Sequence, residues 1–385
     1  MFSLLLMLAV SQTACFSQAS SNPEQILENA AGKTAAPKEG GLMLDTARHF
    51  YPVPVIKDFI DTLSHSGGSF LHLHFSDNEN YALESRILNQ RAEDARVNEE
   101  GLYVNPVTDK PFLSFAQLDE IKAYAKARNI ELIPELDSPS HMDAIFALLA
   151  NARGKSYVNS LKSKGSDDEI NVNKPESIAF VKSLIGEVAD AFGDGSRHFH
   201  IGGDEFGYDV ESNHEFIRYA NSLAGFLKAR KLTPRMWNDG VIKATVDKLD
   251  HDIQITYWSY DGDTENKQDA KTRRNIRASL PDLLAKGFGV LNYNSYYLYI
   301  TPQQNWRTSH DSDFAMRDVE NRWNLGVWDG ENKANAVKDP SKILGAALSI
   351  WGENAGSMSS QTIQKYTSGL LESVIKKTHA QTDKK

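Results

Sequence analysis

The chain has 385 residues, of which 41% are hydrophobic, 24% charged and 10% aromatic, which is the composition of an ordinary globular protein. This composition excludes disorder, collagen-like repeats and a polytopic membrane protein. The 42 Lys and Arg against 51 Asp and Glu give a net charge of −9. An acidic chain argues against nucleic acid as a partner, because phosphate binding needs a basic surface.

The first 40 residues are expected to precede the fold. Phe2–Val10 is an apolar run broken only by Ser3, too short for a membrane span and typical of a signal peptide. We predict a signal peptide over residues 1–20, a tail over residues 21–40, and secretion, with a lipoprotein anchored through Cys15 as the alternative. Cys15 is the only cysteine, which excludes an internal disulfide and a thiolate metal cluster.

From residue 41 onward the chain alternates strand-like and helix-like segments. Eight strands are predicted, at Gly41–Arg48, Phe70–Asp77, Ile130–Asp137, Arg197–Asp204, Thr233–Asn238, Ile253–Ser259, Gly289–Asn294 and Leu344–Trp351. Apolar residues spaced three and four apart predict helices over 55–63, 115–125 and 178–188, and residues 215–230 and 360–377 are further candidates.

Eight strands, each followed by a helix or a long loop, favour the α/β class and a single (β/α)8 barrel over residues 41–385. The runner-up is an open doubly wound sheet. No Gly-x-Gly-x-x-Gly motif follows an early strand in the sequence, which argues against that alternative.

Polar and aromatic residues gather at the carboxyl ends of the predicted strands, where barrel enzymes carry their active sites. Carboxylates, indoles and a tyrosine cluster together suit a carbohydrate, because sugar rings offer both an apolar face and hydroxyl groups. The strand ends that carry such residues are Asp45-Thr-Ala-Arg48-His49, His72-Leu-His74-Phe-Ser-Asp77-Asn78, Glu135-Leu-Asp137-Ser-Pro-Ser-His141, His200-Ile-Gly-Gly-Asp204-Glu205, Trp237-Asn238-Asp239, Tyr257-Trp258, Tyr293 through Tyr299, and Trp351-Gly-Glu353-Asn354.

Asp204 and Glu205 are adjacent, which bears on the chemistry. Cutting a glycosidic bond ordinarily needs two carboxylates that flank the bond, but neighbouring strand residues point to opposite faces. The alternative is that one carboxyl group protonates the leaving oxygen while the substrate supplies its own nucleophile.

The motif His200-Ile-Gly-Gly-Asp204-Glu205 resembles the signature of family 20 glycoside hydrolases, the β-N-acetylhexosaminidases. The resemblance covers residues 40–378, and several matching strand ends in the right order are more specific than the Asp-Glu pair alone. They include Leu-Asp45-Thr-Ala-Arg48, His72-Leu-His74-Phe-Ser-Asp77, Glu135-Leu-Asp137-Ser-Pro-Ser-His141, Tyr257-Trp258-Ser-Tyr260 and Trp351-Gly-Glu353.

The resemblance implies substrate-assisted catalysis with retention of configuration. By this reading, Glu205 is the general acid and then the general base. Asp204 accepts the N–H of the substrate's 2-acetamido group, and Tyr299 donates to the acetamido oxygen.

The resemblance also implies roles for the other candidates. Trp237, Trp258 and Trp351 wall the pocket, and Arg48 and Glu353 hold distal hydroxyls of the terminal sugar. Asp77 and His141 support the acid, and we expect this support to raise the pKa of Glu205 so that it stays protonated near neutral pH.

The implied substrate is a polysaccharide, the β-1,6-linked poly-N-acetylglucosamine of biofilm matrix. We expect a monomer without cofactor or metal. Two other classes stay open: a non-catalytic sugar-binding barrel, and a metal-dependent barrel hydrolase that uses His72 and His74, since two imidazoles on one strand face can bind a divalent ion.

Overall fold

The computed structural model describes residues 37–261, 266–303, 309–328 and 335–380. The predictions for the signal peptide, for Cys15 and for most of the tail lie outside these residues. The described residues form one compact unit. No helix in the described part of the chain is long and apolar enough to cross a membrane.

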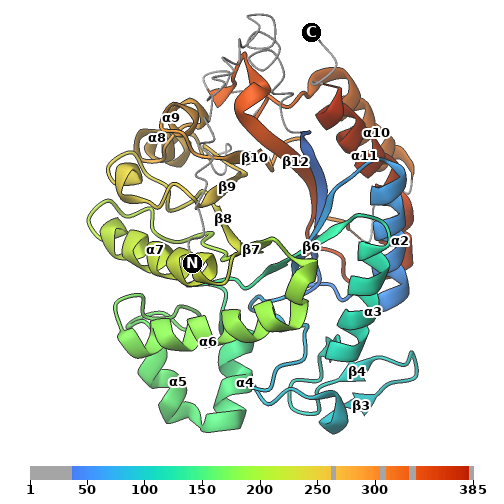
Figure 1. The fold of residues 1–385 in the computed structure, drawn as a ribbon, viewed down its shortest axis with the longest axis vertical. Helices are drawn as coiled ribbons and strands as arrows, with labels where there is room; N and C mark the ends of the chain where they lie inside the picture. The colour runs from blue at the N-terminus through green and yellow to red at the C-terminus, as the bar shows by residue number, and fades with distance from the viewer. Residues whose placement is uncertain (1–36, 262–265, 304–308, 329–334, 381–385) are drawn as a thin grey trace, which may run out of the picture. The chain divides into compact units, whose positions relative to one another are not determined.

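Eight parallel strands close into a barrel, with the helices arranged around them (Figure 1). They are β1 (Glu39–Asp45), β2 (Phe70–His74), β6 (Glu131–Glu135), β7 (His198–His200), β8 (Thr233–Trp237), β9 (Gln254–Tyr257), β10 (Val290–Asn292) and β12 (Ile343–Ile350). Each strand pairs with the next, and β12 pairs in parallel with β1 to complete the ring. The prediction of a (β/α)8 barrel is confirmed.

The helices follow the predicted amphipathic segments and add several more. They are α2 (Val53–His65), α3 (Phe115–Lys126), α4 (Asp143–Arg153), α5 (Lys155–Leu161), α6 (Pro175–Phe192), α7 (Asn213–Ala229), α8 (Lys267–Ile276), α9 (Leu280–Ala285), α10 (Ser309–Arg322) and α11 (Ser360–His379). The apolar face of α2 shows why the pattern predicts a helix, since Val55, Ile56, Phe59, Ile60 and Leu63 are all buried.

Two small features depart from the predicted elements. Residues between β2 and α3 form an antiparallel sheet of two-residue strands, β3 (Arg96–Val97), β4 (Tyr103–Val104) and β5 (Pro111–Phe112). The strand β11 (Tyr299–Ile300) pairs with the end of β12 and fixes Tyr299 beside it. These strands are too short to leave a periodic signal in the sequence.

The predicted fourth strand is too long at its carboxyl end. The structure ends β7 at His200, because Gly202 and Gly203 adopt φ values of +75° and +95°, which a strand does not allow. Asp204 and Glu205 therefore lie in a turn beyond the strand. The expectation that they point to opposite faces of a strand does not apply.

The barrel interior is filled by apolar side chains from several strands. Met43, Phe70, Ile133, Leu291 and Ala347 are buried in one cluster that also touches the indoles of the cavity described below. A second, larger cluster lies between the strands and the surrounding helices. The interior is thus a packed core that supports the strand ends, as in other barrels of this type.

Candidate active site

A cavity of about 210 Å³ lies at the carboxyl ends of the barrel strands. Nine of the ten predicted site residues line it: Arg48, His141, Asp204, Glu205, Trp237, Trp258, Tyr299, Trp351 and Glu353. The tenth, Asp77, lies between Arg48 and His141 and contacts both. The residues that the family resemblance selects among the strand ends therefore lie in one site.

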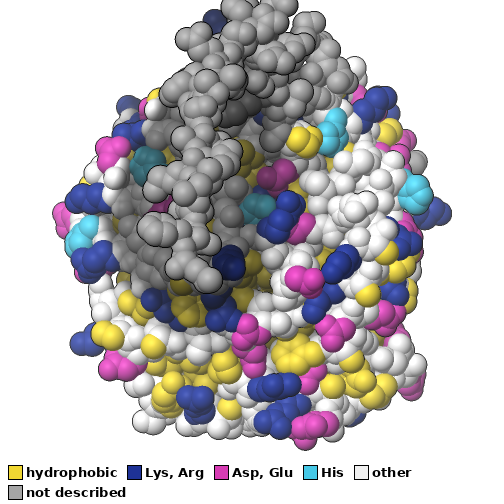
Figure 2. All heavy atoms as spheres, viewed as in Figure 1, with side chains coloured by type: hydrophobic (Ala, Val, Ile, Leu, Met, Phe, Trp, Pro, Cys, Tyr) yellow, Lys and Arg dark blue, Asp and Glu magenta, His cyan; other side chains and the backbone are white. Residues whose placement is uncertain are grey.

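Size alone does not identify this cavity, because depressions of about 870 and 800 Å³ lie elsewhere on the described surface. The smaller cavity is distinguished by its carboxylates, indoles and imidazole. Figure 2 shows acidic, basic and histidine side chains side by side near the middle of the viewed face.

The Gly202–Gly203 turn brings the Asp-Glu pair to the cavity. A side chain at position 202 would place its Cβ 1.9 Å from Asp137 Oδ1, and the backbone N–H of Gly203 donates to the same oxygen over 3.3 Å. Because neither glycine has a side chain, the turn lies against Asp137, and Asp204 follows it directly.

Asp137 lies beside the site, although the sequence predicts no role for it. Its side chain is fully buried, and burial together with the nearby carboxylate of Asp204 raises the pKa of Asp137 well above its ordinary value. The protonated form of Asp137 is therefore favoured, and carboxyl oxygens of Asp137 and Asp204 lie within 4.8 Å of each other. The residue stands in the quoted Glu135-Leu-Asp137 motif, but only the structure shows its distance from Asp204.

Glu205 contacts the imidazole of His141. The distance from His141 Nε2 to Glu205 Oε2 is 3.4 Å, and the distance to Asp204 Oδ2 is 3.8 Å. On the other side of the ring, His141 Nδ1 lies 3.1 Å from Asp77 Oδ1. Burial alone would lower the pKa of His141, but Asp204, Asp77 and Glu205 raise it above its ordinary value, so the ring is an imidazolium.

The sequence predicts a raised pKa for Glu205, and this prediction is wrong for the empty cavity. The imidazolium of His141, 3.4 Å away, stabilises the carboxylate and lowers the pKa of Glu205, and the 68% exposure of its side chain leaves the charge hydrated. Glu205 is therefore ionised in the empty cavity, and the proton resides on His141.

Arg48 joins the cavity to the carboxylates beside it. Its guanidinium lies 2.7 Å from Asp77, 3.3 Å from Asp45 and 3.4 Å from Glu79, and it lies over the ring of Trp351 at 5.4 Å from the ring centre. These contacts fix the side chain while it still lines the cavity. This position is compatible with the substrate-binding role that the resemblance implies for Arg48.

The aromatic residues form a continuous wall. The ring of Tyr299 stacks on Trp351 at 5.5 Å and on Trp258 at 6.4 Å, and Trp237 lies 6.0 Å from Trp351. Burial raises the pKa of Tyr299, so its hydroxyl stays protonated and can donate. The wall suits the apolar face of a sugar ring.

Two indoles donate hydrogen bonds to buried carboxylates for which the sequence predicts no role. Trp258 Nε1 donates to Asp239 Oδ2 over 2.6 Å, and Asp239 is paired with the buried Arg277. Trp237 Nε1 donates to Glu135 Oε1 over 2.6 Å. Asp239 is adjacent to Asn238 at a predicted strand end, which was the only signal in the sequence.

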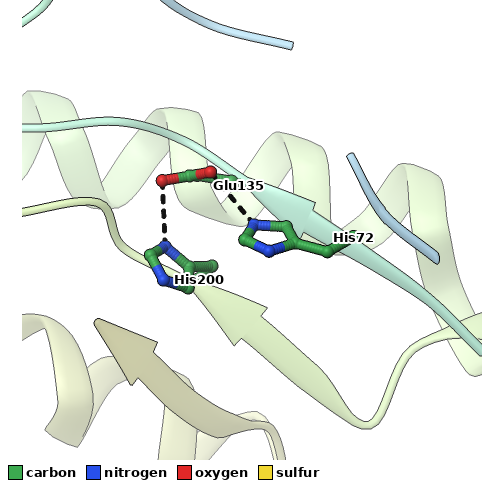
Figure 3. Close-up of side chains that lie close together, drawn as sticks. All are labelled: His72, Glu135 and His200. Atoms are coloured by element: carbon green, nitrogen blue, oxygen red, sulfur yellow. Dashed lines mark ion pairs between the residues drawn. The ribbon is translucent and has the colours of Figure 1, made fainter. Parts of the chain in front are cut away.

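His72 and His74 both face Glu135, and Figure 3 shows Glu135 between His72 and His200. Glu135, His72 and His200 lie close enough together to surround a metal ion, whereas His74 belongs to a different group with Asp77 and Asp137. However, Glu135 accepts the indole N–H of Trp237, and the backbone N–H of Gly202 points to His200 Nδ1 over 3.1 Å. Protons therefore occupy the positions that a metal would need, which favours a hydrogen-bonded network.

The tight glycine turn generates a first prediction. Gly202→Ala is expected to lower the free energy of unfolding by about 3 kcal/mol or more, because the new Cβ meets Asp137 and the residue has a left-handed backbone. Urea unfolding measures the change. The matched control is Gly225→Ala in α7, where nothing lies within 4 Å of the added Cβ and a gain of about 0.5–1 kcal/mol is expected. Equal stability of Gly202→Ala and the wild type would contradict the described turn.

Comparisons with known proteins agree with this geometry. The profile described as glycosyl hydrolase family 20, catalytic domain, matches residues 40–366. The crystal structure of Dispersin B is similar to this chain with a TM-score of 0.86 and 62% identity, covering 89% of this chain and 99% of that one.

Two curated relatives are more distant. Lacto-N-biosidase of Bifidobacterium bifidum is 24% identical over 280 residues, which cover 66% of this chain and 22% of that protein. Beta-hexosaminidase 3 of Arabidopsis thaliana is 24% identical over 319 residues, which cover 82% of this chain and 52% of that protein. The chain thus spans about half of the length of these relatives, or less. It belongs to glycosyl hydrolase family 20, and its barrel is a glycoside-hydrolysing catalytic domain of that family.

Proposed function

We propose that the protein is a retaining β-N-acetylhexosaminidase that cleaves β-1,6-linked poly-N-acetylglucosamine by substrate assistance. The observation that carries the proposal is the single cavity that gathers nine of the ten residues selected by the family resemblance. The similarity to Dispersin B and to a curated β-hexosaminidase supports the activity. The polymer and its linkage are inferred from the resemblance to Dispersin B.

The first chemical step uses Glu205, Asp204 and Tyr299. The acetamido carbonyl oxygen attacks the anomeric carbon while the bond from that carbon to the glycosidic oxygen breaks. Glu205 gives its proton to the leaving oxygen. Asp204, which lies beside Asp137, accepts the acetamido N–H and stabilises the positive charge of the oxazolinium ring, while Tyr299 donates to the acetamido oxygen.

The second step reverses the roles. A water molecule attacks the anomeric carbon and gives a proton to Glu205, and the bond from the anomeric carbon to the acetamido oxygen breaks. This restores the acetamide and leaves the sugar with retained configuration. Two displacements at one carbon account for retention without a second carboxylate nucleophile.

Glu205 must gain its proton before the first step, because it is ionised in the empty cavity. A sugar bound in the cavity removes water from Glu205, and loss of hydration raises the pKa of a carboxyl group. His141, 3.4 Å away, then passes its Nε2 proton to Glu205. Substrate binding thus prepares the acid.

Substrate assistance predicts dependence on the acetamido group. The wild type should hydrolyse a chromogenic β-N-acetylglucosaminide and leave the matching β-glucoside intact. Glu205→Gln should lower kcat at least about 100-fold, since general acid catalysis contributes about 10²–10⁴-fold. The matched control is Glu211→Gln, an exposed acidic residue six positions along, which should keep wild-type rates. Rapid cleavage of the β-glucoside would contradict the mechanism, and equal, negligible turnover by wild type and Glu205→Gln would favour a sugar-binding barrel.

The linkage forms a separate prediction. Defined β-1,6-linked N-acetylglucosamine oligomers should be cleaved with a kcat/KM at least about tenfold above that of β-1,4-linked oligomers of equal length, a difference of about 1.4 kcal/mol in transition-state binding. Product analysis by chromatography and mass spectrometry measures both rates. A preference for the β-1,4 linkage would overturn the proposed polymer while leaving the hexosaminidase activity in place.

The hydrogen-bonded network around Glu135 predicts independence from metal. Dialysis against a chelator should leave hydrolysis of the chromogenic β-N-acetylglucosaminide unchanged, because N–H groups contact Glu135 and His200. Metal analysis of the dialysed protein is the control. Loss of activity on dialysis and recovery on adding a divalent ion would support the metal-dependent alternative that uses His72 and His74.

A further inference from the structure

Glu135 is a buried carboxylate at the end of β6 that the proposed mechanism does not use. Its Oε2 lies 2.7 Å from His74 Nδ1 and 3.0 Å from His72 Nε2, and its Oε1 lies 3.0 Å from His200 Nδ1. Trp237 Nε1 donates to Oε1 over 2.6 Å. Figure 3 shows the carboxylate between the rings of His72 and His200. Four side chains from three strands thus converge on one charge.

His74 connects this charge to the active site. Its Nδ1 faces Glu135, and its Nε2 lies 2.8 Å from Asp77 Oδ2. A ring that faces a carboxylate at both nitrogens carries a proton on each. Burial alone would lower the pKa of His74, but Glu135 and Asp77 raise it well above its ordinary value. His72 differs, because burial lowers its pKa to about 4.

The contacts continue from Asp77 to the acid. Asp77 Oδ1 lies 3.1 Å from His141 Nδ1, and His141 Nε2 lies 3.4 Å from Glu205 Oε2. The resulting chain alternates in charge along its length, from the barrel interior to the cavity: Glu135 negative, His74 positive, Asp77 negative, His141 positive and Glu205 negative. Each charge stabilises its neighbours.

We propose that Glu135 and His74 are positioning residues that control the proton shared by His141 and Glu205, a role that rests on the proposed function of Glu205 as the acid. Glu135 keeps His74 charged, and charged His74 offsets part of the negative charge of Asp77. Asp77 then stabilises the imidazolium of His141 less strongly. The Nε2 proton of His141 therefore passes more readily to Glu205 when the sugar excludes water.

Other charged groups act on the same chain and remain in place in every variant below. Asp45 acts on His74 from β1, Arg48 acts on Asp77 and Glu205, Glu79 lies beside Arg48, and Asp137 and Asp204 act on His141. Tyr293, whose hydroxyl lies 3.4 Å from His72, and the ring of Trp351, edge-on to His74, are neutral neighbours.

The test is the pH profile of Glu135→Gln. Gln is neutral, so His74 loses the partner that keeps it charged, and Asp77 holds the proton of His141 more strongly. The basic limb of kcat/KM for the chromogenic β-N-acetylglucosaminide should move about one pH unit upward, and kcat should fall about tenfold with KM within about twofold. An unchanged basic limb, or a shift to lower pH, would overturn the proposal.

Glu131→Gln is the matched control. Glu131 begins β6, where Glu135 ends it, and it also pairs with a buried histidine of β7: Glu131 Oε1 lies 2.9 Å from His198 Nδ1. Its Oε2 lies 2.8 Å from Arg197. Glu131→Gln should lower the thermal midpoint while leaving the pH profile unchanged. If Glu131→Gln shifts the basic limb as much as Glu135→Gln does, the shift reflects a general loss of stability, and the proposal is overturned.

Two measurements keep the proposal testable if Glu135→Gln fails to fold. His74→Gln removes the positive charge itself and should shift the basic limb in the same upward direction. Nitrogen-15 NMR of the wild type at pH 7 should show His74 protonated on both nitrogens and His72 neutral. A neutral His74 would overturn the proposal. Undiminished hydrolysis by Glu205→Gln would instead overturn the proposed function, so the two failures are distinguishable.

Discussion

The buried carboxylate of Glu135 is the interaction on which the site depends. A charge with no exposed surface costs several kcal/mol unless donors surround it. Here the donors are His74 on β2 and Trp237 on β8, and the ring of His200 on β7 lies against the same carboxylate. In the barrel β2 and β7 are the direct neighbours of β6, and β8 is the neighbour of β7. The contacts of the Glu135 carboxylate therefore fix the relative positions of three strand ends. These ends carry Asp77, the Asp204–Glu205 turn and the ring of Trp237.

The backbone around the acid is strained in a way that these contacts compensate. Glu205 and His141 both have left-handed backbones, with φ values of +52° and +61°, a conformation that costs non-glycine residues about 1–3 kcal/mol. His141 is fixed by its contact with Asp77, which in turn is fixed by His74 and Arg48. The ion pairs thus hold His141 Nε2 and Glu205 Oε2 3.4 Å apart, which is the contact that the proposed proton transfer uses.

Much of the fold and site could be predicted from the sequence, for a physical reason. Apolar strands that alternate with amphipathic helices predict a barrel, and a barrel places its active site at strand ends, so Arg48, Asp204 and Trp351 could be selected without coordinates. The roles of Asp137 and Glu135 could not be predicted, because they depend on distances across strands. The predicted upward shift of the Glu205 pKa is wrong for the same reason. The imidazole of His141, 3.4 Å away, lowers this pKa by more than the nearby carboxylates raise it.

Asp204 and Glu205 show how one turn gives two carboxylates different chemistry. The side chain of Asp204 is 13% exposed and lies against Asp137, so the protein itself fixes its environment before substrate arrives. The side chain of Glu205 is 68% exposed, so its environment is completed by whatever fills the cavity. A ligand that leaves water around Glu205 leaves the carboxylate ionised, and a sugar that excludes this water favours the protonated acid. In the proposed mechanism, binding energy would thus be converted into readiness for bond cleavage at this one side chain.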